Sequence, residues 1–90
     1  MFYVYILRSL KNGKLYYGHA EDVTIRVERH NACREKYTKS GVPWELIHQE
    51  SYLTRGEAMK REKYLKKLKS PKYILENVVG KLVSGGSAAR

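Results

Sequence analysis

The chain opens with two short apolar runs, residues 3–7 and 15–18, which are separated by a polar segment centred on Asn12-Gly13. Asn-Gly between apolar runs is typical of a β-hairpin with a type I′ turn, because both central residues of that turn need positive φ. Side chains alternate between the two faces of a strand, so one face of the first strand carries Tyr3, Tyr5 and Leu7. The hairpin therefore aims phenol groups from two paired strands at the same place.

The next segment predicts a short helix followed by a third strand. Asp22 is a suitable N-cap for a helix that runs to about His30, with two valines one turn apart on its buried face. Residues 31–43 are polar and rich in turn-forming residues, which indicates a surface loop. Residues 44–52 then predict a strand, although their apolar positions are too mixed to assign its faces.

Two further helices are predicted in the C-terminal half. Thr54 and Glu57 fit a capping box at the start of a helix that runs to about Leu68. Ser70-Pro71 supplies an N-cap and a first-turn proline for another helix. The predicted order is thus two strands, a helix, a strand and two helices.

Composition adds a size limit and a preferred partner. Ninety residues with a hydrophobic share of 42% are enough for one modest core, so we expect one domain over residues 1–82 and a flexible tail over residues 83–90. Eighteen Lys and Arg against nine Asp and Glu give a net charge of +9. This excess favours an anionic partner, most commonly nucleic acid, and the alternative is a basic surface that serves only solubility.

Several classes of protein are disfavoured. Cys33 is the single cysteine, so the chain has no internal disulfide and no multi-cysteine zinc site, as is typical of a reducing compartment. We therefore expect a cytoplasmic protein. The first residues lack the pattern of a signal peptide. No apolar run approaches the ~20 residues that a membrane helix needs, so we expect no membrane association.

A carboxylate in an apolar stripe is the first candidate for chemistry. Glu62 lies on the same face of its predicted helix as Ala58, Leu65 and Leu68. A carboxylate at such a position must be paired, protonated or bound to a metal, because burial of a lone charge is too costly. It is either the partner of an arginine from another element or a ligand for Mg²⁺, which takes oxygen ligands and often only one or two protein carboxylates.

Basic side chains offer three more candidates, each with an alternative. Arg26 either pairs with Glu62, lies in solvent or binds phosphate oxygens with its guanidinium fork. His30, one turn later, is either a packed helix residue or a proton-handling group. A lysine row on the later helix is either a solvated face or a phosphate-contacting surface, and it comprises Lys60, Lys63 and Lys67. Tyr, Arg, His and a lone Glu together suit metal-assisted phosphodiester cleavage.

Five segments occur in a fixed order along the chain: Tyr3-Val4-Tyr5, Tyr16-Tyr17-Gly18, residues 22–31, residues 36–46 and residues 57–63. In this order and at this spacing they resemble the GIY-YIG endonuclease superfamily, and within it the small stand-alone single-domain members. The first two segments stand where the family has Gly-Ile-Tyr and Tyr-Ile-Gly. The third resembles the following helix, which ends in His-Asn, and the last is similar to the family's Ala-x-x-x-Glu helix.

The resemblance implies an α+β fold with a three-stranded antiparallel sheet flanked by helices, in the order β-β-α-β-α-α. It implies that Tyr5 and Tyr16 form the phenolic pair, that Arg26 contacts phosphate and that His30 is the helix histidine. It also implies that Glu62 holds one Mg²⁺ or Mn²⁺ ion. We expect the phenols, the arginine and the carboxylate to converge on one surface groove. A phenol with a pKa near ~10 is a poor base, so we expect the metal and Arg26 to lower that value.

The expected function is metal-dependent hydrolysis of phosphodiester bonds in nucleic acid, with DNA favoured over RNA. The alternative is a non-catalytic nucleic-acid-binding module that retains the nuclease fold. The sequence indicates no protein partner. Two departures from the family pattern stand out: Tyr3 replaces the first glycine, and His19 occupies a position where a small or aliphatic residue is expected and either crowds the site or adds a proton acceptor. The residues expected to bind nucleic acid are Lys36, Lys39, Lys60, Lys63 and Lys67.

Overall fold

The computed structural model describes residues 1–32 and 38–79, and it confirms the predicted order of strands and helices. Lys36 and the predicted tail, residues 83–90, lie outside this part of the chain. No helix in the described ranges is long and apolar enough to cross a membrane. The elements are β1 (Phe2–Ser9), β2 (Leu15–Ala20), α1 (Val23–Asn31), a 3₁₀ turn (Lys39–Gly41), β3 (Trp44–Tyr52), α2 (Arg55–Leu68), α3 (Pro71–Ile74) and a π-helical turn (Leu75–Val79).

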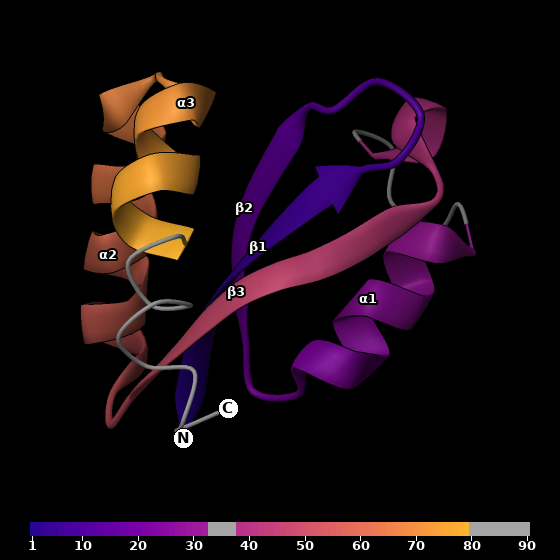
Figure 1. Cartoon of the computed structure of the whole chain (residues 1–90). Coiled ribbons are helices and arrows are strands. Elements are labelled where there is room, and N and C mark those ends of the chain that lie inside the picture. Colours follow the sequence, from indigo (N-terminus) through magenta and orange to yellow (C-terminus); the bar gives the residue numbers. More distant parts are fainter. Residues whose placement is uncertain (33–37, 80–90) are drawn as a thin grey trace, which may run out of the picture.

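The three strands form an antiparallel sheet in the order β2-β1-β3, so the first strand is central and the other two are edges. Helix α1 covers one face of the sheet, and α2 and α3 cover the other (Figure 1). This arrangement is the α+β fold that the sequence predicts. Because β1 is covered on both sides, its residues 4–7 are all fully buried.

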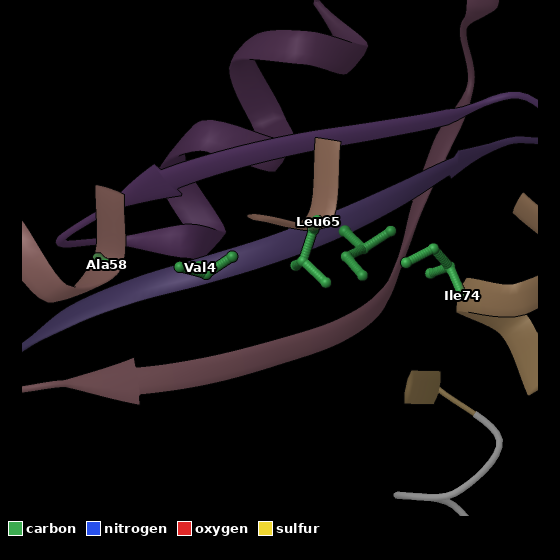
Figure 2. Packing of buried hydrophobic residues seen from close by; sticks show 5 residues of the cluster. Val4, Ala58, Leu65 and Ile74 are labelled. Atoms are coloured by element: carbon green, nitrogen blue, oxygen red, sulfur yellow. The ribbon is translucent and has the colours of Figure 1, made fainter. Parts of the chain in front are cut away.

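Alternation along β1 supplies a separate core to each face of the sheet. Val4 and Ile6 pack against apolar residues of α2 and α3, with Ala58, Leu65 and Ile74 fully buried among them (Figure 2). On the other face, the second core consists of Tyr5, Leu7, Val23 and Trp44. The predicted assignment of alternate residues of β1 to opposite faces is therefore confirmed.

The predicted helix starts are confirmed in their hydrogen bonds. Asp22 caps α1, because its carboxylate accepts the backbone N–H of Ile25 at 3.0 Å. Thr54 and Glu57 form both hydrogen bonds of a capping box at the start of α2. At the start of α3, the Ser70 side chain accepts a backbone N–H, and Pro71 follows in the first turn. These contacts satisfy N–H groups that would otherwise have no partner within the helix.

The turn between β1 and β2 differs from the predicted type I′ turn. The strands end at Ser9 and begin again at Leu15, and only Gly13 of the Asn-Gly pair has positive φ, at +77°. The Ser9 hydroxyl accepts the backbone N–H groups of the two residues before Gly13, and the Asn12 side chain accepts that of Lys14. Side-chain hydrogen bonds therefore stabilise a longer loop, in which Asn12 does not need the left-handed conformation.

A side-chain amide joins the end of α1 to the start of β3. Asn31 accepts the backbone N–H of Trp44 at 2.6 Å and donates to the Trp44 carbonyl oxygen at 3.0 Å. The indole of Trp44 in turn donates to the Thr38 carbonyl oxygen at 2.7 Å. These bonds fix the last turn of α1, and with it His30, against the sheet.

Candidate functional site

Tyr5 lies at the centre of the α1-covered face, and its position depends on a glycine in the neighbouring strand. Tyr5 pairs with Gly18 across the β1–β2 ladder. A Cβ atom at Gly18 would lie 2.5 Å from the Tyr5 hydroxyl oxygen and 2.6 Å from its ring. The phenol therefore lies directly over Gly18 and extends toward the β2 edge of the sheet.

Tyr16 and His30 complete an aromatic cluster around this phenol. The Tyr16 and His30 rings meet edge to face with centroids 4.8 Å apart, and the Tyr5 centroid is about 6 Å from both, at 6.3 and 6.1 Å. The Tyr5 hydroxyl lies 3.2 Å from His30 Nε2, which is within hydrogen-bond distance. The structure thus brings together the two phenols and the helix histidine.

His30 is fully buried and has a second partner that the sequence did not identify. Its Nδ1 lies 2.7 Å from the hydroxyl oxygen of Thr38, which is also buried. When the Tyr5 hydroxyl donates to Nε2, Nδ1 carries the ring proton and donates to Thr38. Thr38 lies between two expected lysine contacts, and its position in the sequence gave no sign of a bond to a residue eight positions earlier.

Arg26 joins this cluster from the first half of α1, but its charge does not determine the ionisation of Tyr5. Burial raises the pKa of Tyr5, the Arg26 hydrogen bond and charge lower it, and the charges of Tyr16 and Glu62 raise it. The pKa of Tyr5 ends above its ordinary value. Arg26 alone therefore does not lower the pKa of Tyr5 below its ordinary value, because desolvation of this ring outweighs the arginine. The expected lowering by arginine and metal together stays a prediction.

Glu62 comes from α2, the helix on the opposite face of the sheet. Its Oε1 atom lies 2.5 Å from His19 Nδ1, and its Oε2 atom accepts from Lys66 Nζ at 2.6 Å. Partial burial raises the pKa of Glu62, but the bonds from Lys66 and His19 outweigh it, and the pKa lies below its ordinary value. The carboxylate is thus ionised at neutral pH, and the described structure pairs it with a lysine and a histidine rather than an arginine.

A surface pocket borders on both parts of the site, through Arg26 and through His19. It has a volume of about 340 Å³, and both Arg26 and His19 lie in its wall, together with the first turn of α1. Arg26 contacts Tyr5, and His19 contacts Glu62. The groups come from both faces of the sheet, and the charge of Glu62 acts on Tyr5. Tyr5, Tyr16, His30 and Glu62 do not themselves line this pocket, so their convergence on one groove stays a prediction.

The donor set fits a hydrated divalent ion rather than an all-protein metal cage. Residues 1–32 and 38–79 contain no group of three or more His, Cys, Asp and Glu side chains that could hold a metal. Glu62 supplies one ionised carboxylate beside the pocket. A single carboxylate suits Mg²⁺ or Mn²⁺, because Mg²⁺ keeps several waters and takes further oxygens from phosphate.

The lysines expected to bind nucleic acid lie in two places. Lys39 is exposed in the 3₁₀ turn. On α2, a shallow hollow is lined, among the described residues, by one tyrosine and four lysines, which include the predicted row: Lys60, Lys63, Tyr64, Lys66 and Lys67. This basic hollow lies on the helix that carries Glu62.

A polar network on β3, which the sequence analysis missed, holds α2 against the sheet. Glu50 accepts two bonds from Arg61 of α2, at 2.9 and 3.1 Å, and further bonds from Tyr52 and His48 at 2.6 and 2.7 Å. Burial raises the pKa of Glu50, but these hydrogen bonds lower it by more, so the pKa ends at about 2. The period-two spacing of residues 48, 50 and 52 was the available signal. Because Arg61 precedes Glu62, this network also positions the candidate metal ligand.

Gly18→Ala should destabilise the protein by about 1–3 kcal/mol, because the new methyl group overlaps the Tyr5 phenol and forces it to move. We expect a lower Tm in thermal unfolding followed by circular dichroism. Gly56→Ala is the matched control, since the nearest atom to a Cβ at that exposed helical position is 4.0 Å away. Equal Tm values for the two variants would contradict the placement of Tyr5 over Gly18.

Comparisons with known proteins show the family of the chain. The family described as the GIY-YIG catalytic domain matches residues 1–82. UPF0213 proteins from Staphylococcus epidermidis and Staphylococcus aureus are each 48% identical over 65 residues, which is 71% of this chain and 78% of theirs. No solved structure matches. The family match spans all of the described residues, and the chain belongs to the GIY-YIG nuclease family.

Proposed function

We propose that the protein is a divalent-metal-dependent endonuclease that hydrolyses phosphodiester bonds in nucleic acid, with DNA as the favoured substrate. The observation that carries this proposal is the hydrogen bond of Tyr5 with His30, with Arg26 acting on the same phenol, and a pocket lined both by Arg26 and by His19, the partner of Glu62. A phosphate in this pocket would meet Arg26 in the wall, and the metal-binding carboxylate of Glu62 would lie behind His19. This arrangement suits phosphoryl chemistry, which depends on positioning and charge stabilisation.

Arg26 binds the scissile phosphate in this proposal. Its guanidinium lies in the pocket wall, and its planar fork matches two phosphate oxygens. Negative charge on the equatorial oxygens is redistributed as water attacks, and a fixed cation stabilises that charge more in the transition state than in the ground state.

Tyr5 and His30 handle the proton of the attacking water. Because its pKa is raised, Tyr5 is neutral at physiological pH and cannot accept a proton without losing its own. Tyr5 is fully buried in this structure, so a water would have to be admitted beside it when substrate binds. The Tyr5 hydroxyl would then pass its proton to His30 Nε2 as it accepts one from that water, while Nδ1 stays bonded to Thr38. Tyr16 packs against both rings and holds them in position relative to each other.

Glu62 would hold the metal ion through its ionised carboxylate, one ion per site. When bound, a Mg²⁺ or Mn²⁺ ion supplies positive charge for the leaving oxygen and polarises water. The lysines of the hollow on α2 would contact backbone phosphates, in line with the net charge of +9. The non-catalytic alternative needs only these lysines, and it assigns no role to Glu62.

Purified protein should convert supercoiled plasmid to the nicked form with Mg²⁺ or Mn²⁺, and Glu62→Gln should lower that rate at least ~10²-fold by removing the charged ligand. Glu57→Gln, on the same helix, is the control: it is exposed and the amide can keep the capping box. Equal nicking by equally pure wild type and Glu62→Gln would show contamination and favour the binding module. Salt-dependent binding to nucleic acid, without nicking in the presence of any divalent metal, would also favour the binding module.

A further inference from the structure

His19 is the only histidine whose ring reaches the surface. The chain has three histidines, all of them in the described ranges, and two are buried with exposures of 0% for His30 and 2% for His48. The His19 side chain is 27% exposed and lies in the wall of the pocket that also contains Arg26. An imidazole at this position is open to a ligand from solution.

The contact of His19 with Glu62 places a nitrogen donor beside an oxygen donor. Nδ1 and Oε1 are 2.5 Å apart, so a single proton bridges them. A divalent ion that replaces this proton needs the two donors about 3 Å apart, as for neighbouring ligands at ~2.1 Å. A shift of about half an ångström suffices, and His19 is exposed enough to make it.

We propose that His19 Nδ1 joins Glu62 Oε1 as a second protein ligand of the metal. The site then binds divalent ions that accept imidazole nitrogen more tightly than it binds Mg²⁺. This inference rests on the proposed role of Glu62 as metal ligand. Imidazole suits Co²⁺, Ni²⁺ and Zn²⁺, and affinity rises from Mn²⁺ to Ni²⁺ at sites with nitrogen donors, whereas Mg²⁺ is bound almost entirely by oxygen. The pocket of about 340 Å³ beside His19 has room for the remaining waters and a phosphate oxygen.

Lys66 does not block this site, because the two carboxylate oxygens have different partners. Lys66 bonds to Oε2, and His19 bonds to Oε1. A metal at Oε1 therefore leaves the lysine bond in place. Lys66 nevertheless neutralises part of the carboxylate charge, so its removal should strengthen metal binding while it leaves both donors present.

Ni²⁺ and Mg²⁺ should be titrated into the protein by calorimetry without nucleic acid, with every variant in a Cys33→Ser background to remove the only thiol. We expect wild type to bind Ni²⁺ at least ~10²-fold more tightly than Mg²⁺, and His19→Ala to weaken Ni²⁺ at least ~10-fold with less than a twofold change for Mg²⁺. His19→Asn, which offers an amide oxygen near the same place, should lower the Ni²⁺ to Mg²⁺ preference. Lys66→Gln should bind Ni²⁺ as tightly as wild type or more tightly.

Ni²⁺ affinity that is unchanged in both His19 variants would overturn the inference, provided that circular dichroism shows them folded. Selective paramagnetic broadening of the His19 ring signals by Ni²⁺ in the protein that retains His19 would support the inference, even if the His19 variants are less stable. The two proposals fail separately. Plasmid nicking without any dependence of Ni²⁺ affinity on His19 overturns only the second ligand, whereas His19-dependent Ni²⁺ binding without nicking overturns only the nuclease.

Discussion

Arg26→Ala should lower the rate of plasmid nicking by roughly 10²-fold or more, with little change in affinity for nucleic acid. The guanidinium contacts Tyr5 and lies in the pocket wall, where a phosphate would meet it. In the proposed mechanism its loss removes an interaction that is strongest in the transition state, whereas we expect binding to come mainly from the lysines of α2. The rate should be measured at saturating plasmid, and the affinity by a separate titration with Ca²⁺ in place of Mg²⁺.

Two further variants make this test specific. Arg26→Lys keeps the charge but loses the planar fork, so we expect it to stay well below the wild-type rate. Arg29→Ala removes a cation from the exposed part of the same helix, and its rate should stay within about threefold of wild type. If Arg26→Ala and Arg29→Ala lose the same activity, Arg26 contributes only general charge.

Glu50→Gln should lower the free energy of unfolding by about 2–3 kcal/mol and the Tm by about 10–20 °C. Glu50 accepts four hydrogen bonds, and the amide cannot satisfy Arg61, Tyr52 and His48 at once. The change also leaves a partly buried arginine without its charged partner. Urea unfolding at pH 7, followed by circular dichroism, measures the loss directly.

The same residue predicts the acid sensitivity of the fold. The pKa of Glu50 is about 2 in the folded protein against an ordinary value of 4.5, which corresponds to about 3 kcal/mol at neutral pH. Because the folded value is the lower one, this stabilisation is present above pH 4.5 and is lost as the pH falls through about 2. The stability difference between wild type and Glu50→Gln should therefore shrink over this range.

Glu45→Gln is the control for Glu50→Gln, because Glu45 is exposed on the same strand. Its stability should stay within about 0.5 kcal/mol of wild type at every pH. A difference between wild type and Glu50→Gln that does not change between pH 5 and pH 2 would contradict the assigned ionisation of Glu50.

Local features of the sequence predicted most of the backbone. The N-caps at Asp22, Thr54 and Ser70 each act on a backbone N–H only three positions later, so the chain itself determines the contact. Alternation in β1 likewise assigned Val4 and Tyr5 to opposite faces. The Asn-Gly turn was predicted wrongly, since Ser9 competes for the same backbone groups through its hydroxyl, and a rule based on the two central residues takes no account of it.

The site was harder to predict because its contacts join distant segments. The register of β1 and β2 decides that Tyr5 lies over Gly18, and the packing of α2 decides that Glu62 meets His19, 43 positions away. The hydrophobic periodicity of the sequence predicts neither contact. The sequence pattern could not predict the raised pKa of Tyr5 either, because this pKa depends on how completely the surrounding residues exclude water from the ring.

The amide bridge from Asn31 to Trp44 has a consequence for self-association. β3 is an edge strand, and its outward N–H and C=O groups form a template on which another chain could add a strand. Asn31 occupies both outward groups of Trp44, as the backbone of a fourth strand would. The Asn31 side chain thus blocks strand addition at Trp44, and it shortens the part of the edge on which an aggregate could grow.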